Sequence, residues 1–383
     1  MGEWTRRGFL GSSAAAGLAG LAAGSAPDKD GEKEEKEIPN FRFPFDAQPP
    51  KKVKGGNNSK EVTVRELPIS TGMAGVSMRL EPGGMRELHW HTASEWAYVV
   101  KGRVRTTVIS PDGTSETDDF EPGDVWFFPA GHAHSLQGLG PDECHFVLVF
   151  NDGSFSETST FSITDWIGHT PKSVLSKVFG LSEAELDKLP KEEAYFARGP
   201  VPPGRPAPPL SGALRSPAST HKFRLAAQEP VFRGKGGVER RVSVREFPVS
   251  TTTTGVLLDL EPGAVREPHW HPNADEWQFI VSGHVRIGAF GAKGRFRAES
   301  FDPGDAGYVP RMFGHYVENA SDTEPARLLI VFNSGDYQAI DLTEWIASNP
   351  VYLLAENLAL PAATVEKLPR RPVRIADKDG DGE

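Results

Sequence analysis

The sequence has little cysteine, since Cys144 is the only one in 383 residues. A single cysteine cannot form an internal disulfide, so no disulfide framework stabilises this fold. The run CHFVLVF around it favours a small buried hydrophobic residue over a nucleophile. The chain also lacks an excess of positive charge, since 52 Asp and Glu outnumber 42 Lys and Arg. This balance argues against nucleic-acid binding, which usually needs a basic face, but local arginines could still bind a small anion.

The sequence also lacks a long hydrophobic run. The apolar stretch near the N-terminus is short and rich in Gly and Ser, which argues against a permanent membrane span. TRRGFL (Thr5–Leu10) precedes this stretch and resembles a twin-arginine export signal, and small residues follow up to Ala26. We therefore predict a signal peptide at residues 1–26 and an exported protein, periplasmic or secreted. The alternative is a disordered basic tail.

Glycine and proline are abundant, and the chain is one module written twice. VTVRELPIS (Val62–Ser70) returns as VSVREFPVS (Val242–Ser250), and LEPGGMRELHWH (Leu80–His91) returns as LEPGAVREPHWH (Leu260–His271). The period is too long for a solenoid. The predicted organisation follows the repeat: a charged, Pro-rich segment at residues 27–60, a first domain at 61–198, a Pro-rich linker at 199–220, a second domain at 221–375 and an acidic tail at 376–383.

Each module consists of short runs in which apolar and polar residues alternate, separated by turn sequences such as EPGG, SPDG and DPGD. This pattern is typical of an antiparallel β-sandwich or barrel, so we predict an all-β protein of two tandem barrels. A helical stretch follows each barrel, and Ser182 and Glu185 predict a capping box at one of them. These helical tails would cover a barrel or pack on a neighbouring subunit, so we expect a homo-oligomer.

Each module carries three histidines and one glutamate in the same order. Residues two apart in a strand face the same side, so the two histidines of each HxH pair point the same way. A glutamate follows each pair, and a third histidine comes five residues after a proline. Such a set, present twice, is a strong metal signal. The predicted ligands are His89, His91, Glu95 and His134 in the first module and His269, His271, Glu276 and His315 in the second.

Two segments of each module resemble the two cupin motifs. In the first module they are GGMRELHWHTASEWAYVVKG (Gly83–Gly102) and GDVWFFPAGHAH (Gly123–His134). From about Phe41 onward the chain resembles the bicupin oxalate decarboxylases, which implies two tandem cupin barrels of the double-stranded β-helix, or jelly-roll, kind. Two positions depart from the second motif: Gly138 stands where Asn is usual, and Met312 where Gly is usual. Neither is a predicted ligand.

The ligand types narrow the choice of metal. Three imidazoles and a carboxylate would saturate tetrahedral zinc and leave no open position for a substrate. Mixed nitrogen and oxygen ligation allows manganese or iron, and ligand type alone does not choose between them. The resemblance favours Mn(2+), two ions per chain, with dioxygen as a catalytic co-substrate.

The first module is three residues longer than the second after the shared strand, NDGSFSETSTFSITDW against NSGDYQAIDLTEW. The extra length falls on SETST (Ser156–Thr160), a small polar loop that could be a mobile lid. Without the comparison of the two modules, it would be read as an ordinary exposed loop. The resemblance implies that Glu157 acts on the substrate and that the lid also contains Ser156, Thr158, Ser159 and Thr160.

Each module has an arginine three residues before its HxH pair, Arg86 and Arg266. Simple alternation puts Arg86 on the face opposite the histidines, unless a bulge returns it. The resemblance assigns Arg86 to the substrate carboxylate and makes Arg266 a candidate anion contact in the second site. The family to which the resemblance points can carry a carboxylate near the second metal, and the matching position here is Ile330, which cannot move a proton. We therefore predict a structural or supportive role for the second site. Trp90 and Trp270 alternate away from the ligands and are expected in core or inter-domain packing.

The resemblance thus implies an exported, manganese-dependent oxalate decarboxylase that converts oxalate to formate and carbon dioxide, with Glu157 and Arg86 as catalytic residues. The expected partner is oxalate, with no nucleic acid and no membrane after signal cleavage. One alternative is oxalate oxidase, which gives carbon dioxide and hydrogen peroxide. Others are a non-enzymatic metal-binding bicupin and a cupin dioxygenase or isomerase with a larger substrate. Storage members of the family usually lose ligand histidines, whereas this chain keeps all eight ligands.

Overall fold

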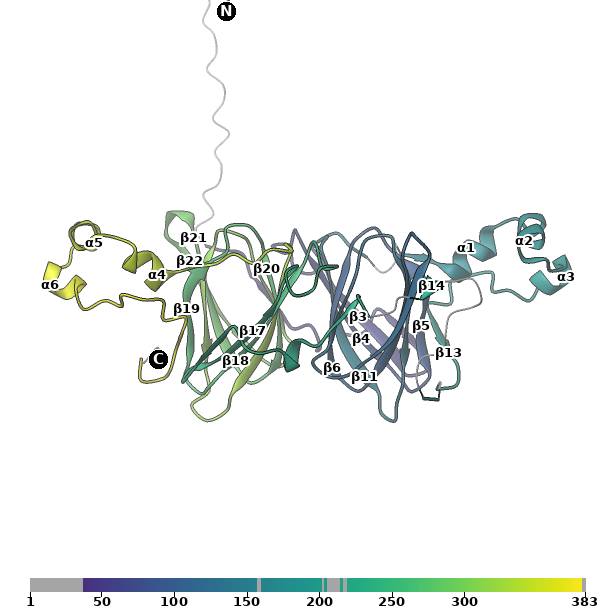
Figure 1. Cartoon of the computed structure of the whole chain (residues 1–383), viewed down its shortest axis with the longest axis horizontal. Coiled ribbons are helices and arrows are strands. Elements are labelled where there is room, and N and C mark those ends of the chain that lie inside the picture. Colours follow the sequence, from purple (N-terminus) through teal and green to yellow (C-terminus); the bar gives the residue numbers. More distant parts are fainter. Residues whose placement is uncertain (1–36, 157–159, 202, 205–213, 216–218, 381–383) are drawn as a thin grey trace, which may run out of the picture. The chain divides into compact units, whose positions relative to one another are not determined.

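The structure is a computed structural model that describes residues 37–156, 160–201, 203–204, 214–215 and 219–380. Residues 37–383 form one compact unit, in which two β-barrels stand side by side (Figure 1). The predicted all-β class with two tandem barrels is confirmed. The predicted signal peptide lies outside the described residues.

The first barrel consists of two facing sheets. Its inner sheet, on the side of the second barrel, has the strand order β15 (Lys222–Phe223), β9 (Val125–Phe128), β6 (Glu95–Lys101), β11 (Cys144–Phe150), β4 (Ala74–Leu80), β3 (Asn57–Val62) and β2 (Lys52–Lys54). Its outer sheet has the order β12 (Phe161–Ser162), β5 (Gly84–Trp90), β10 (Ala133–Gly138), β7 (Val104–Ile109), β8 (Thr114–Phe120) and β14 (Leu214–Arg215), with β13 (Phe196–Arg198) also on β5. The boundary expected between residues 60 and 61 falls inside β3.

The second barrel repeats this architecture. Its inner sheet has the order β1 (Arg42–Phe43), β23 (Ala306–Val309), β20 (Glu276–Ser282), β25 (Ala326–Phe332), β18 (Thr254–Leu260), β17 (Gly237–Val242) and β16 (Phe232–Gly234). Its outer sheet has the order β22 (Arg295–Phe301), β21 (Val285–Gly291), β24 (Gly314–Asn319), β19 (Val265–Trp270) and β26 (Ile340–Asp341), with β27 (Ile375–Ala376) also on β19.

The inner and outer sheets differ in sequence because they differ in burial. In β6, Trp96 and Tyr98 belong to a hydrophobic cluster shared by both barrels, whereas Ala97 and Val99 face the core of the first barrel. Strands buried on both faces read as continuous apolar runs, which explains EWAYVV and CHFVLVF. The outer strand β10 alternates buried with half-buried residues, as expected of a strand with one face outside the core.

Two tryptophans fasten the barrels to each other. A Cβ atom on Gly255 would lie 2.2 Å from the ring of Trp96, and one on Gly75 would lie 2.4 Å from the ring of Trp277. Only glycine allows these close approaches. Each barrel therefore packs a tryptophan ring directly against a glycine of the other barrel.

The barrels also exchange short strands at the edges of their inner sheets. β1, near the N-terminal end of the described chain, pairs with β23 of the second barrel, through Arg42 opposite Gly307. β15, which follows the linker, pairs with β9 of the first barrel, through Lys222 opposite Trp126. Each barrel therefore completes its inner sheet with backbone from the segment that precedes the other barrel.

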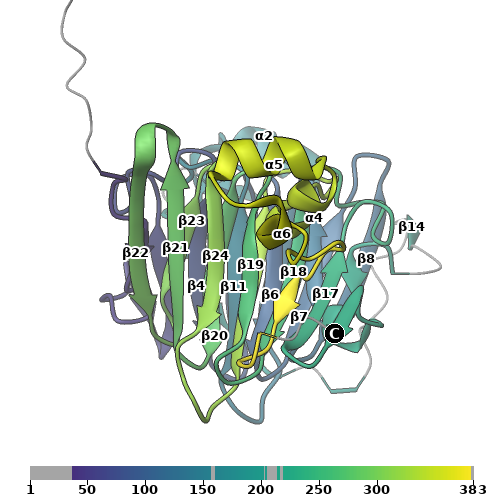
Figure 2. The ribbon, with the colours of Figure 1, turned by 90° about the vertical axis from the view of Figure 1, so that its left-hand side faces the viewer.

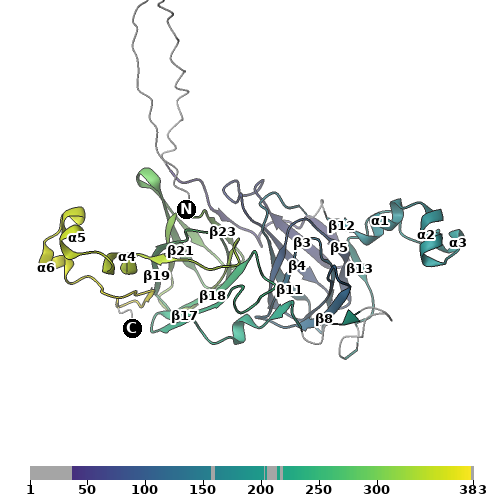
Figure 3. The ribbon, with the colours of Figure 1, turned by 45° about the horizontal axis from the view of Figure 1, so that its top comes forward.

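Short helices extend from the two ends of this body (Figures 1 and 3). The first arm contains α1 (Ile163–His169), α2 (Lys172–Phe179) and α3 (Glu183–Leu186), and the second contains α4 (Leu342–Ala347), α5 (Val351–Leu358) and α6 (Ala362–Val365). The capping box predicted at Ser182 and Glu185 is confirmed at α3. Figure 2 shows the second arm in front of the outer sheet of its barrel. Among the described residues, no helix is long and apolar enough to cross a membrane.

Met312, which stands where the second motif usually has glycine, adopts a strained backbone conformation. Met312 has φ of 70°, and Gly131 at the same turn of the first barrel has φ of 77°. This left-handed conformation suits glycine and strains other residues. The turn keeps its shape in both barrels because Gly131 and Met312 both donate their N–H to the carbonyl of the second HxH histidine.

Candidate metal centres and active site

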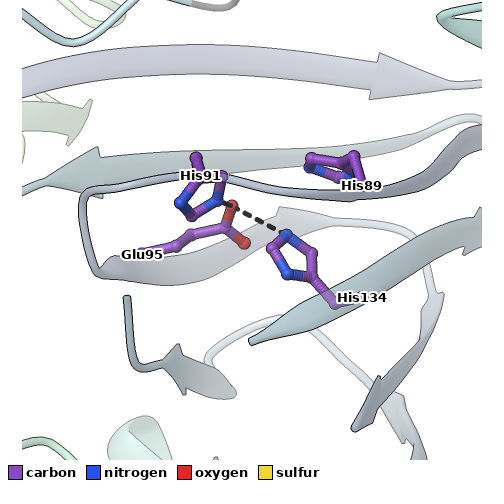
Figure 4. A group of neighbouring side chains, drawn as sticks. All are labelled: His89, His91, Glu95 and His134. Atoms are coloured by element: carbon purple, nitrogen blue, oxygen red, sulfur yellow. Dashed lines mark hydrogen bonds and ion pairs between the residues drawn. The ribbon is translucent and has the colours of Figure 1, made fainter. Parts of the chain in front are cut away.

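The four predicted ligands of the first barrel meet inside it. β5 carries His89 and ends just before His91, β6 begins at Glu95, and β10 places His134 directly opposite His89. Their ligand atoms all lie within 4.8 Å of one another, and all four side chains are buried (Figure 4). The predicted grouping is confirmed.

Backbone carbonyls fix the orientation of the three imidazoles. The Nδ1 atoms of His89, His91 and His134 lie 2.6, 2.6 and 2.8 Å from the carbonyl oxygens of Glu87, Ala93 and His132 respectively. A carbonyl only accepts, so each Nδ1 donates its hydrogen and each Nε2 keeps a lone pair. This second layer of contacts is the usual way in which proteins orient metal-binding histidines.

The carboxylate of Glu95 lies among these lone pairs. Its Oε2 is 3.3 Å from Nε2 of His91 and 3.4 Å from Nε2 of His134, and its Oε1 accepts a hydrogen bond from Nε1 of Trp126 at 2.7 Å. Burial alone would raise the pKa of Glu95, but the charge and hydrogen bonds of His134 and His91, when these rings are protonated at Nε2, hold it well below its usual value. Burial, together with the charge of Arg86, lowers the pKa of His89 well below its usual value. An ionised carboxylate beside neutral imidazoles is the state that binds a metal.

The second barrel builds the same centre on β19, β20 and β24. The predicted ligands again lie within 4.8 Å of one another and are buried. Nδ1 of His269, His271 and His315 lies 2.8, 2.7 and 3.0 Å from backbone carbonyls. Gln278 donates a side-chain hydrogen bond to the ligand Glu276. Sequence reasoning missed both Trp126 and Gln278, although both lie inside the cupin motifs, because the motifs do not indicate which side chain contacts the ligand carboxylate.

Both ligand sets fit a divalent cation. Nε2 of His134 and Nε2 of His271 are buried and have no hydrogen-bond partner among the described residues. These nitrogens and the glutamate carboxylate beside them both offer only lone pairs, so burying them side by side costs free energy. A cation bound between them removes that cost. Four protein ligands leave two positions of a six-coordinate ion open, as manganese or iron would have.

An irregularity in β5 brings Arg86 to the centre. The pairing of β5 with β10 changes register between His134 and Leu136, and both Arg86 and His89 are buried while Leu88 between them is exposed. The bulge required by the sequence argument is therefore present. Nη2 of Arg86 donates to Oγ1 of Thr160 at 3.2 Å, and its guanidinium carbon lies 4.0 Å above the ring centre of Tyr195.

The predicted lid is anchored at both ends near this centre. Phe155, just before it, stacks on Phe150 at 3.6 Å and contacts His91 edge-on at 5.6 Å between ring centres. At the other end, Thr160 contacts the arginine. Ser156 is buried, whereas Glu157, Thr158 and Ser159 lie outside the described residues. The roles predicted for these three residues stay predictions.

The second centre differs in its surroundings. Ile330 is buried beside it. Arg266, the candidate anion contact, donates from Nη2 to Oδ1 of Asp341 at 2.7 Å and from Nη1 to the carbonyl of Arg374 at 3.2 Å. The anion at this arginine is thus a carboxylate of the protein itself, which sequence reasoning missed.

The expectation for Trp90 and Trp270 was wrong. Both are half-buried; Trp90 stacks on Phe161 at 5.3 Å, and Trp270 meets Trp345 of α4 edge-on at 5.5 Å. These rings face the helical arms, and the contact between the barrels is made by Trp96 and Trp277 instead. Cys144 is buried as expected, and burial raises the pKa of its thiol to about 12, which leaves it inert as a nucleophile.

Comparison with known proteins gives one consistent result. The sequence profile of the cupin family matches residues 44–187 and 223–366. Oxalate decarboxylase OxdC of Bacillus subtilis is 42% identical over 323 residues, 84% of this chain and 83% of that protein. A probable oxalate decarboxylase of Arthroderma benhamiae is 35% identical, over 86% of this chain and 81% of that protein.

Solved structures agree. The structure of the Bacillus subtilis oxalate decarboxylase at pH 4.6 has a TM-score of 0.83 and 39% identity, over 90% of this chain and 90% of that one. A structure of the same enzyme described for its Mn(II) centres has a TM-score of 0.83 and 39% identity, over 90% of this chain and 91% of that one.

Proposed function

The chain belongs to the cupin family and, within it, to the two-barrel oxalate decarboxylases, and we propose from this that it converts oxalate to formate and carbon dioxide at its first metal centre. One observation supports the choice of centre. The first barrel combines a complete ligand set with a buried arginine that hydrogen-bonds to Thr160, the last residue of the lid. Both centres hold manganese, in keeping with the Mn(II) centres of the Bacillus subtilis relative.

Bound manganese would supply a Lewis acid with open positions and one-electron chemistry. Arg86 binds one carboxylate of the hydrogen oxalate anion, a task that suits a planar guanidinium. Glu157 accepts the proton of that anion and returns it to carbon after carbon dioxide has left, so one hydrogen oxalate gives one carbon dioxide and one formate. A base that later acts as an acid works best in a closed, dry site. Dioxygen is proposed as a co-substrate that is regenerated in each cycle.

The test is a product assay on the purified, manganese-loaded protein. We expect formate and carbon dioxide in equal amounts from oxalate, with metal analysis giving up to two manganese ions per chain. Hydrogen peroxide as the main product would indicate an oxalate oxidase. No turnover of oxalate by fully loaded protein would refute the proposal, as would zinc alone in active protein.

We also propose a homo-oligomer that forms through the helical arms. Trp166 in the first arm and Tyr352 in the second are 64% and 71% exposed, and an apolar cavity of about 670 Å³ lies between the second barrel and α4, beside Phe290 and Trp345. Exposed apolar surface of this kind marks protein contacts. Light scattering should give a multiple of the chain mass for the wild type and a lower mass for Tyr352→Glu. An unchanged mass would contradict a role for this arm.

Export by a twin-arginine route remains a proposal that the sequence supports. Arg6 and Arg7 lie outside the described residues, and the support is the order of arginine pair, apolar stretch and small residues. Replacing both arginines with lysine should leave unprocessed protein in the cytoplasm. Normal export of that variant would exclude this route.

A further inference from the structure

A network of charges surrounds the arginine of the second centre. Besides its 2.7 Å contact with Asp341, Arg266 lies 4.0 Å from the carboxylate of Glu239. Arg374 lies 3.9 Å from Glu239 and 3.9 Å from Asp341. The side chains of Arg266, Asp341 and Glu239 are at most 5% exposed. Arg241 also lies 3.8 Å from Glu239, so the two buried carboxylates are surrounded by arginines.

The strand registers identify the matching positions of the first barrel. Ser162 lies opposite His89 as Asp341 lies opposite His269. Ser59 of β3 lies opposite Met78 of β4, and Glu239 of β17 lies opposite Leu258 of β18 in the same way. Tyr195 and Arg374 precede the residues that pair with the two arginines. Arg266 is matched by Arg86 in the first barrel. Its charged neighbours Asp341, Glu239 and Arg374 are matched there by Ser162, Ser59 and Tyr195.

The second centre has too little space for the substrate, and the first has a buried polar group that is open to one. The cavity at the second centre, enclosed by residues such as Arg266, Ile330 and Tyr337, has a volume of about 10 Å³. One water needs roughly 10–15 Å³ measured in this way, so oxalate, with six non-hydrogen atoms, does not fit. In the first barrel, the hydroxyl of Ser162 is buried and has no hydrogen-bond partner among the described residues. A buried polar atom in that state is available to a ligand.

We propose that Asp341 is a built-in substitute for the substrate carboxylate: it occupies Arg266 and keeps oxalate out of the second centre. Oxalate at that arginine would have to displace Asp341 and deprive its buried carboxylate of the 2.7 Å ion pair with Arg266, which is strongly unfavourable. Ser162, in the same place in the first barrel, is shorter and uncharged, so it does not compete with a substrate carboxylate for Arg86. This inference rests on the proposed function, because it takes oxalate as the ligand.

The first experiment removes the substitute. Calorimetric titration of the manganese-loaded protein should give one oxalate per chain for the wild type and two for Asp341→Ser. Asp341→Asn removes the charge but keeps the volume, so it should still bind one. Formate should raise the Tm of Asp341→Ser more than that of the wild type, because it replaces the missing carboxylate. Two oxalates per wild-type chain, or one per Asp341→Ser chain without extra stabilisation by formate, would overturn the proposal.

The reciprocal experiment keeps the proposal testable if Asp341→Ser does not fold. Ser162→Asp places a carboxylate beside the first arginine, so the KM for oxalate should rise at least about tenfold while the manganese content stays the same. Ser162→Asn has nearly the same size without the charge and should raise the KM less. A wild-type KM for Ser162→Asp would contradict the proposal. If the wild type does not turn over oxalate, the proposed function fails, and the titrations and the formate effect still test the role of Asp341.

Discussion

Replacing Glu87 with glutamine should separate the folding of the first arm from its part in substrate binding. Glu87 is buried in β5, next to Arg86. Its Oε2 accepts hydrogen bonds from Oγ1 and N–H of Thr164 at 2.6 and 3.3 Å, and its Oε1 accepts the N–H of Tyr195 at 2.6 Å. One carboxylate thus ties both ends of the first arm to the strand that carries the arginine and a metal ligand.

The size of the effect follows from these contacts. An amide keeps the shape of the side chain but replaces one accepting oxygen with a donor, so Glu87→Gln loses one or two of the three bonds. Hydrogen bonds to a charged group contribute roughly 1.5–3 kcal/mol each, so the variant should lose about 1.5–6 kcal/mol of stability. The released backbone at Tyr195 also displaces the ring that lies 4.0 Å from the guanidinium of Arg86, and the KM for oxalate should rise.

The chain offers a matched control. Glu267 accepts the N–H and Oγ1 of Thr343 at 2.9 and 2.8 Å and the N–H of Arg374 at 2.6 Å. Glu267→Gln should therefore lower the urea midpoint of unfolding by about as much as Glu87→Gln, and steady-state kinetics should show a raised KM only for Glu87→Gln. An equal change of KM in both variants, or a wild-type midpoint for Glu87→Gln, would refute the reasoning.

Three further predictions concern the first barrel. Glu157→Gln should lower formate production by about 10²–10⁴-fold, the usual size of acid–base catalysis, and shift residual turnover toward peroxide; near-normal formate would remove Glu157 from the mechanism. Trp126→Phe removes the 2.7 Å bond to Glu95 and should weaken manganese binding by about 10–100-fold at the first centre, as measured against a chelator, with the second centre unchanged. Burial and the charge of Arg79 lower the pKa of His145 from 6.5 to about 4, so stability should be lost as the pH falls from 6.5 to 4. Tm measured against pH should be flatter in that window for His145→Gln, and an equal slope would contradict the argument.

The metal ligands could be predicted from the sequence because strand alternation and motif spacing depend only on residues that are close in the chain. Alternation with period two places His89 and His91 on one face, and the duplication confirms the set independently in the second half. The position of Arg86 could not be predicted from the same rule, since alternation puts it on the wrong face. Only the register shift opposite Leu136, which depends on how β10 pairs with β5, resolves that point.

Contacts between distant segments could not be predicted in the same way. Asp341 reaches Arg266 from 75 positions away, and it matches Ser162 only after the lid is recognised as an insertion. The strands β1 and β15 have two residues each, too few for any periodic signal. Trp90 was misassigned because alternation indicates which face a ring occupies but not which helix will cover that face.

The exchange of β1 and β15 makes the two halves resemble a tethered dimer. Each half supplies an edge strand to its neighbour's inner sheet. Strand pairing therefore holds the halves together, and the linker only keeps them in one chain. Proteolytic cleavage of that linker should therefore yield two fragments that still travel together on a sizing column. A gene for either half alone would encode a barrel with a bare sheet edge, and such edges tend to recruit other chains. Fusion into one polypeptide makes the correct partner the nearest one.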